Sequence, residues 1–516
     1  MSTTPEYLDS HGGRPEPTRG RRTAWVVGGA GAVLAVLGVG AWAAWSFFAT
    51  GAQPAEALPA STIAYASIDL DPSGGQKIEA LRTLREFPAI KDELDLDTDD
   101  DVRRRIFEAI QDSGTCPDLD FADDVEPWLG DRMAVAAVDT GEDEPAPVLV
   151  LQVSDEDAAD AGLSALEDCA GEDADTAWSI RDGWAVVGES QDVLDQMADD
   201  AAQAPLSDDD DFRHWTGEAG GGGIATVYVA AAAGELVADR IGTQDDAGAA
   251  HSYEECPAPC LGYAGVGTDD VPPEVGDALR DFGGMAATLR FDDGALELEV
   301  AADAGDAQSA LAGSTGGDDV VATLPEDTGV ALGVGFAQGW LADLVDDDTL
   351  RRLSDETGLD WPEDAETLVG SSTALAVSGD IDPEAAIESA DGSDVPVGLK
   401  VLGDADAIAD VVERLGGPFE VDSDGEVVAV GPDADYRAEL LEDGGLGDTD
   451  VYRRALPDAA DASAVLFVGF DAGDWLDRAV GDDAELADNL APLEAVGLSA
   501  TTTGDTTHVV LRVTTG

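Results

Sequence analysis

The sequence has very few basic side chains. Its 516 residues include 26 Lys and Arg against 110 Asp and Glu, a formal net charge of −84, and its lysines are Lys77, Lys91 and Lys400. Nucleic-acid binding needs basic residues that displace phosphate counterions, so we exclude nucleic acid as a partner. The acidity predicts a soluble, self-repelling surface, and it could reflect either genome composition or adaptation to high salt.

Catalytic and metal-binding motifs are also scarce. The sequence has neither a G-x-S-x-G elbow nor a phosphate-binding Walker loop. None of its histidines stands in a ligand motif; they are His11, His214, His251 and His508. We therefore predict no catalytic residue, no cofactor-binding residue, no cofactor and no metal ligand.

Three acidic stretches raise the question of calcium. The stretch 420–431 has acids at its positions 1, 3 and 5 and Gly at position 6, but Gly431 stands where a calcium loop needs Glu. A β-hairpin explains this stretch better. The acidic runs 95–101 and 208–211 could collect cations loosely, although such runs are usually solvated loops.

Cysteine is limited to four residues, namely Cys116, Cys169, Cys256 and Cys260. Three disulfide connectivities are open. We favour Cys116 with Cys169, since both fall at loop ends, and Cys256 with Cys260 as a small closed loop. A redox role for Cys256 and Cys260 is disfavoured because three residues separate them and two glutamates precede them. We predict structural disulfides, which persist outside the cytoplasm.

Residues 25–50 form an apolar run of 26 residues without a charge, and no later part of the sequence repeats that apolar length. A helix of that length would reach ~39 Å, more than the ~30 Å of a bilayer core. Four arginines precede it and acidic sequence follows it. The positive-inside rule therefore predicts a single-pass anchor in the cell membrane, with residues 1–24 in the cytoplasm and the chain after a linker at 51–57 outside. A cleaved signal peptide is the alternative.

The rest of the sequence contains a long-range repeat. Residues 119–138 and 359–378 are identical at 7 of 20 positions, including Gly130 and Gly370. Five further pairs of segments recur in the same order; the first pair is LPASTIAYASIDL from Leu58 and LPEDTGVALGVGF from Leu324. This recurrence predicts a tandem duplication. The copies are 58–303, with a Cys-bearing insertion at about 241–280, and 324–516, joined by a linker at 304–323.

Each copy predicts an α+β module. The runs 148–153 and 397–401 are rich in β-branched residues and suit strands, and a helical pattern over 155–166 follows the first. Asp182-Gly183, Asp293-Gly294 and Asp424-Gly425 predict tight hairpin turns. We expect an antiparallel sheet in each module with helices packed on one face. Whether the copies share one sheet stays open at this stage.

A family resemblance adds to this interpretation. Leu58-Pro59 opens a segment of small and β-branched residues that ends in Asp69-Leu70-Asp71-Pro72. With the short Arg-bearing tail and the apolar run, this resembles the bacterial, largely actinobacterial, membrane-anchored proteins grouped as domain of unknown function 3352. The resemblance implies a cell-envelope protein and supplies no catalytic residues.

Together these patterns predict a non-enzymatic, single-pass envelope protein. Its extracytoplasmic part would bind or scaffold an unknown envelope or extracellular partner. One alternative is an extracytoplasmic hydrolase with its site between the two copies. Converging carboxylates or a histidine in a groove there would favour it, and a filled apolar junction would disfavour it. The other alternative is a calcium-responsive adhesion or sensor module.

Overall fold

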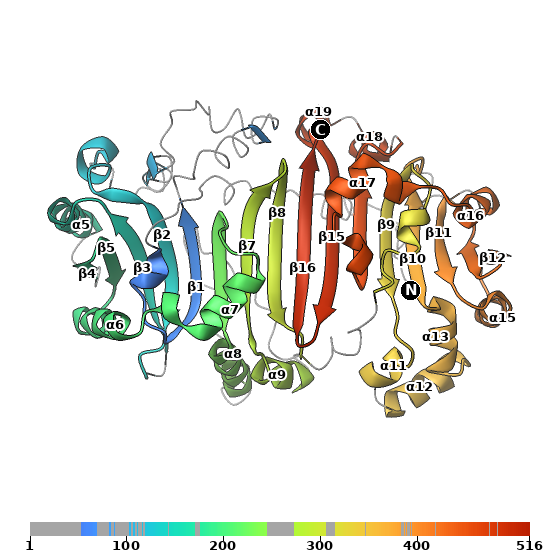
Figure 1. Ribbon diagram of the computed structural model, residues 1–516, viewed down its shortest axis with the longest axis horizontal. Helices are drawn as coiled ribbons and strands as arrows, with labels where there is room; N and C mark the ends of the chain where they lie inside the picture. Colours follow the sequence, from blue (N-terminus) through green and yellow to red (C-terminus); the bar gives the residue numbers. More distant parts are fainter. Residues whose placement is uncertain are drawn as a thin grey trace, which may run out of the picture. The chain divides into compact units, whose positions relative to one another are not determined.

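Sixteen strands form one antiparallel sheet in the computed structural model of the chain (Figure 1). The structure describes residues 53–69 and 119–516, with gaps at 143, 171–175, 245–272, 306–314, 346, 418, 474 and 482 and at several positions in 383–394, and isolated positions between 82 and 116. The strand order is β12-β13-β11-β10-β9-β14-β15-β16-β8-β7-β6-β1-β2-β3-β5-β4.

The first eight strands belong to residues 53–303, which we call the first half. They are β1 Thr62–Asp69, β2 Leu129–Val138, β3 Ala146–Val153, β4 Ala177–Arg181, β5 Trp184–Gly188, β6 Ala225–Ala230, β7 Gly284–Asp292 and β8 Ala295–Asp303. The other eight belong to residues 315–516, the second half. They are β9 Thr328–Gly335, β10 Ser372–Ser378, β11 Val397–Leu402, β12 Glu420–Asp424, β13 Val427–Gly431, β14 Ala464–Gly469, β15 Leu493–Thr503 and β16 Thr506–Thr515.

The two halves have the same strand order. Read from the outer edge inward, the first half runs 4-5-3-2-1-6-7-8 and the second runs 12-13-11-10-9-14-15-16. The innermost strands, β8 and β16, pair with each other over nine residue pairs. Backbone hydrogen bonds therefore continue across the boundary between the halves.

This continuity corrects the predicted fold class. We expected an N-terminal transmembrane helix followed by two sheet modules, whereas the described residues form a single sixteen-stranded sheet. No helix among them is both long and apolar enough to span a bilayer. The run 25–50, which we predicted to span the membrane, lies outside the described residues.

The short-range predictions are confirmed. Asp182-Gly183 joins β4 to β5, Asp293-Gly294 joins β7 to β8, and Asp424-Gly425 joins β12 to β13. Both residues of the first two turns have positive φ, as type I′ turns require. The strands expected at 148–153 and 397–401 are β3 and β11, and the helix expected at 155–166 is α5.

The helices connect these strands. In the first half they are α5 Glu156–Ala170, α6 Gln191–Gln203, α7 Asp210–Glu218, α8 Ala231–Gln244 and α9 Pro273–Arg280. In the second half they are α11 Trp340–Leu344, α12 Asp347–Thr357, α13 Glu363–Val369, α15 Ala405–Leu415, α16 Ala434–Leu441, α17 Asp450–Ala455, α18 Trp475–Val480 and α19 Ala484–Leu490. Asp209 caps α7 and Thr449 caps α17 through their side chains.

Helices cover both faces of the outer strands, not one face as we predicted. Leu163 of α5 packs in one buried cluster with Leu151 and Ala185. Leu194 of α6 packs in another with Val150 and Val186. Successive residues of a strand point to opposite faces, so the two helices lie on opposite sides of the sheet. In the second half, α15 and α16 likewise pack in separate clusters.

Candidate functional site

The boundary between the two halves is the place where a site shared by both would lie. Glu299 of β8 pairs with Val510 of β16 at the middle of the paired residues. On one face of the sheet, α7 packs on β7 and β6 while α17 packs on β15. We call this the charged face, because the side chains between the two helices include arginines and glutamates.

Three charged residues stand side by side on this face. The strand register places Arg290 of β7 beside Glu297 of β8, and Glu297 beside Arg512 of β16. The Arg290 guanidinium lies 2.5 Å from one Glu297 oxygen, and Arg512 donates to the other. One carboxylate therefore pairs with an arginine from each half. We call these three residues the junction ladder.

Further contacts hold the ladder in place. Arg290 also binds Glu299, and Arg512 lies 3.2 Å from the Asp292 carboxylate and donates to its backbone oxygen at 3.1 Å. The side chains of Glu297 and Arg512 are 6% and 9% exposed. Burial opposes the charge of Arg290, but the hydrogen bond to Glu299 and the charges of Glu297 and Glu299 raise its pKa. Pairing of this kind offsets part of the cost of burying the charges.

A groove of about 380 Å³ lies against the ladder. Arg453 and Arg454 of α17 form part of its wall. Arg454 contacts Glu494, and Arg453 donates to Asp450 at 2.9 Å. The charged residues that line the groove balance in sign: Arg290, Arg453, Arg454 and Arg512 stand against Asp292, Asp293, Glu297 and Asp458. In a chain of net charge −84, a groove whose lining charges sum to zero differs from the acidic average of the protein.

His508 lies on the same face, two residues from the centre of the β8–β16 pair. Its Nε2 is 3.2 Å from a carboxylate oxygen of Glu218, at the end of α7. The ring of His214 lies 4.7 Å from that of Trp215, whereas His11 and His251 fall outside the described residues. The junction thus combines a histidine with several carboxylates, and it is neither filled nor apolar.

The chemistry available in this groove is that of fixed charges. Arginine stays protonated and cannot exchange a proton at neutral pH. The Thr514 hydroxyl in the groove is already bonded to the backbone of Ala495, accepting at 3.1 Å and donating at 3.2 Å. Ionic and hydrogen-bonding recognition suits such a surface better than nucleophilic attack.

A second cavity, of about 340 Å³, lies in the first half. Arg132 binds Asp69 at 2.8 Å in its wall, and burial raises the pKa of Tyr65 to about 12. The matching positions in the second half are Gly335 and Ser372, which pair in the same register. There the backbone of Gly316 fills the space and accepts a hydrogen bond from Ser372 at 2.5 Å.

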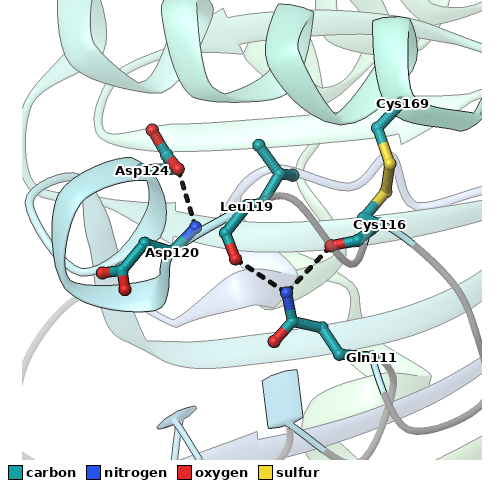
Figure 2. The surroundings of a disulfide bond; sticks show 6 residues. All are labelled: Gln111, Cys116, Leu119, Asp120, Asp124 and Cys169. Carbon is teal, nitrogen blue, oxygen red and sulfur yellow. Dashed lines mark hydrogen bonds between the residues drawn. A yellow bond between two sulfur atoms is a disulfide. The ribbon is translucent and has the colours of Figure 1, made fainter.

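Cys116 and Cys169 form a disulfide, the pairing expected from their positions at loop ends (Figure 2). Their Cα atoms are 5.5 Å apart, and the bond ties the segment before Leu119 to the end of α5. The Gln111 amide donates to the backbone oxygens of Cys116 and Leu119 at 2.8 and 2.7 Å. Cys256 and Cys260 lie outside the described residues.

Where the structure describes the acidic stretches, some of their carboxylates pair with an arginine or cap a helix. The stretch 420–431 is the β12–β13 hairpin, and its Glu420 and Asp422 each bind Arg437 at 2.8 Å. Asp209 in the run 208–211 caps α7, whereas 95–101 lies outside the described residues. The part of the chain that the structure describes contains no group of three or more His, Cys, Asp or Glu residues suited to a metal ion.

Sequence reasoning missed the junction ladder. Arg290 and Glu297 share a hairpin whose turn fixes their register, whereas Arg512 lies more than 200 residues further along the sequence. The signal that could have found this pair was the Asp293-Gly294 turn itself, which sets Arg290 opposite Glu297. Nothing local could indicate Arg512, because its partner strand is more than 200 residues away.

Comparison with known proteins yields one family. No curated protein and no solved structure matches the chain. A family model matches the chain from within the apolar run to β4. Over residues 26–179 the chain resembles the family described as protein of unknown function (DUF3352), in agreement with the resemblance found in the sequence.

Proposed function

We propose that the protein is a non-enzymatic binding or scaffolding protein that acts outside the cytoplasm, in the cell envelope. A disulfide between Cys116 and Cys169 suits an oxidising compartment. The acidic surface suits a soluble domain that repels its own copies. We also infer that the two halves arose by tandem duplication, which the repeated segments and the matching strand orders support.

The observation that carries this proposal is the junction ladder. An enzyme that works between two units usually needs a cleft with free reactive groups. Here Glu297 is shared by Arg290 and Arg512, and β8 and β16 pair along nine residue pairs. These contacts favour a rigid platform on which a partner binds.

Turnover assays test the proposal. The purified full chain is incubated with chromogenic esters, glycosides and phosphate esters, beside a Glu297→Gln variant. The expected result is the same background rate for both proteins. A rate that is saturable in the wild type and lost in a folded Glu297→Gln protein would overturn the non-enzymatic proposal.

Location has its own test. A tag fused after Gly516 should be cleaved by protease added to intact cells. Protection of the tag on intact cells, followed by cleavage after lysis, would contradict an extracytoplasmic location.

A hydrolase at the junction is the second candidate, and the contact of His508 with Glu218 favours it. A carboxylate beside an imidazole is a common general-base arrangement, and His508 lies on the same strand, β16, as Arg512 and Thr514 of the groove. A His508→Gln variant separates the candidates. A hydrolysis rate that is abolished by His508→Gln and reduced by Glu218→Gln would support the hydrolase candidate.

A further inference from the structure

On the face opposite the junction ladder, two adjacent rows of side chains run across the strands and contain no charged residue. Alternate residues of each strand point to this face, so Leu298 lies on it while Glu297 and Glu299 point away. The strand register sets one residue of each strand beside one residue of the neighbouring strand. These residues form a row that crosses the whole sheet. Across six consecutive strands, from β8 to β10, the residue in this row is leucine: Leu298, Leu511, Leu498, Leu466, Leu332 and Leu375.

This leucine row continues in both directions with apolar residues only, ending at Ile180 on β4 and at Val421 on β12. The second row lies two residues along each strand and contains Val135, Val227 and Val300. Its polar members are Thr373 and Ser423. We call the two rows the apolar strip.

The ends of the apolar strip are covered, and its middle is open. At one end α5 packs on Leu151, and at the other α15 packs on Val401. Between them, Val135 is 56% exposed, Leu332 43%, Leu375 39% and Val227 37%. Val135 and Leu375 lie on corresponding strands of the two halves, β2 and β10. Val227 and Leu332 lie on β6 and β9, so each half presents exposed apolar side chains on this face.

The open part of the strip is large. It crosses ten strands, from β2 to β10, and strands lie ~4.8 Å apart with same-face residues ~7 Å apart along a strand, so it measures roughly 48 by 14 Å, or about 700 Å². Contiguous apolar patches of this size on a soluble protein mark interaction sites. Covering the strip would contribute a hydrophobic free energy of about 25 cal/mol for each Å² removed from water.

The chemistry of the strip indicates what covers it. Protein interfaces carry about one hydrogen bond per 100–200 Å², so a protein partner on ~700 Å² would make several. Across the ten open strands the strip offers one side-chain hydroxyl, that of Thr373, and its backbone groups are engaged in the sheet. A second copy of the chain would also bring its own −84 charge against the first.

We propose that the apolar strip binds the aliphatic chains of an amphiphile, such as the acyl chains of a lipid. An aliphatic chain needs no hydrogen bonds, carries no charge, and gains free energy from every methylene removed from water. A sheet face fixes neither the length nor the headgroup of such a ligand, so affinity should follow chain length. This inference rests on the proposed binding function and names the ligand class.

The experiment uses neutral probes, so that headgroup charge plays no part. Octyl, decyl and dodecyl maltoside are titrated below their micelle concentrations into the purified full chain, with calorimetry as the readout. Because each fully buried methylene contributes about 0.8 kcal/mol, a factor of about 4, the expected result is saturable binding that tightens two- to fourfold per methylene.

Two variants locate the site. The double variant Leu332→Asp with Leu375→Asp places charges in the open part of the leucine row, where the exposed side chains leave room for them. It should weaken dodecyl maltoside binding at least tenfold. The matched control is Leu415→Asp, since Leu415 is 52% exposed at the end of α15. This variant should bind dodecyl maltoside as the wild type does. Far-ultraviolet circular dichroism checks that each variant is folded.

Several results would overturn the inference. Binding that the double variant leaves unchanged would place the ligand elsewhere. A dimer that the double variant dissociates, with no maltoside binding, would identify a second copy as the occupant. A monomer that binds no maltoside would contradict the inference, because the strip would then have no affinity for an aliphatic chain. The wider proposal fails separately, since turnover lost in Glu297→Gln would contradict it even if maltoside binds.

Discussion

Glu297 and Arg512 face each other across β8 and β16, the strand pair that joins the two halves, and Arg290 contacts the same carboxylate from β7. The charge of one glutamate is shared by an arginine from each half. Removing it leaves two buried or half-buried cations side by side. The ladder therefore links the two halves through side chains, in addition to the backbone pairing of β8 with β16.

The first prediction concerns this carboxylate. Glu297→Gln should lower the free energy of unfolding by about 3 kcal/mol, because Arg290 and Arg512 stay buried or half-buried and are then compensated only in part, by Glu299 and Asp292. Urea titration followed by tryptophan fluorescence measures the change.

An exposed pair provides the matched control. Arg453 binds Asp450 at 2.9 Å on the surface of α17, with side chains 53% and 90% exposed. Asp450→Asn should change stability by less than about 0.5 kcal/mol. Equal losses for the two variants would show that the ladder contributes no more than a surface pair.

The second prediction concerns Lys400, a buried lysine of β11. Its ammonium donates to the backbone oxygens of Thr323 and Glu442 at 2.8 and 2.9 Å, and burial lowers its pKa from 10.5 to about 8. Between these values the unfolded chain holds the proton more tightly than the folded one, so stability should rise with pH. We expect a rise of about 1–2 kcal/mol from pH 7.5 to 9.5, allowing for solvent screening.

Two variants isolate this proton. Lys400→Met removes the titrating group and Lys400→Arg keeps a charge that does not titrate in this range. Both should lose the rise, whatever their stability at pH 7.5. The account of Lys400 is wrong if either variant follows the same pH dependence as the wild type.

The third prediction concerns the disulfide. Cys116 and Cys169 close a loop with a sequence separation of 53, and a bond that closes a loop of this length stabilises by about 2–4 kcal/mol. Reduction by dithiothreitol should lower the urea midpoint accordingly. A Cys256→Ser/Cys260→Ser protein assigns the effect: it should respond to reduction as the wild type does, whereas a Cys116→Ser/Cys169→Ser protein should not respond. The opposite pattern would place the stabilising bond elsewhere.

The sequence predicted what depends on neighbouring residues. Asp293-Gly294 indicated a hairpin because both positions of a type I′ turn need positive φ. The pairing of β8 with β16 depends on contacts between distant residues, so neither the single sheet nor the partners of Arg512 could be found this way. The second helical layer did leave a signal. The run VLVLQV at 148–153 is apolar at Val150 and Leu151 alike, which is typical of a strand buried on both faces.

The most direct test of the single sheet is native-state hydrogen exchange at its centre. Amides that bond between β8 and β16, at residues 295–303 and 506–515, should exchange as slowly as those of β1 and β9 inside the halves, and with the same dependence on urea. Rapid exchange at both segments, while β1 and β9 stay protected, would show that the halves are separate sheets and would contradict the account.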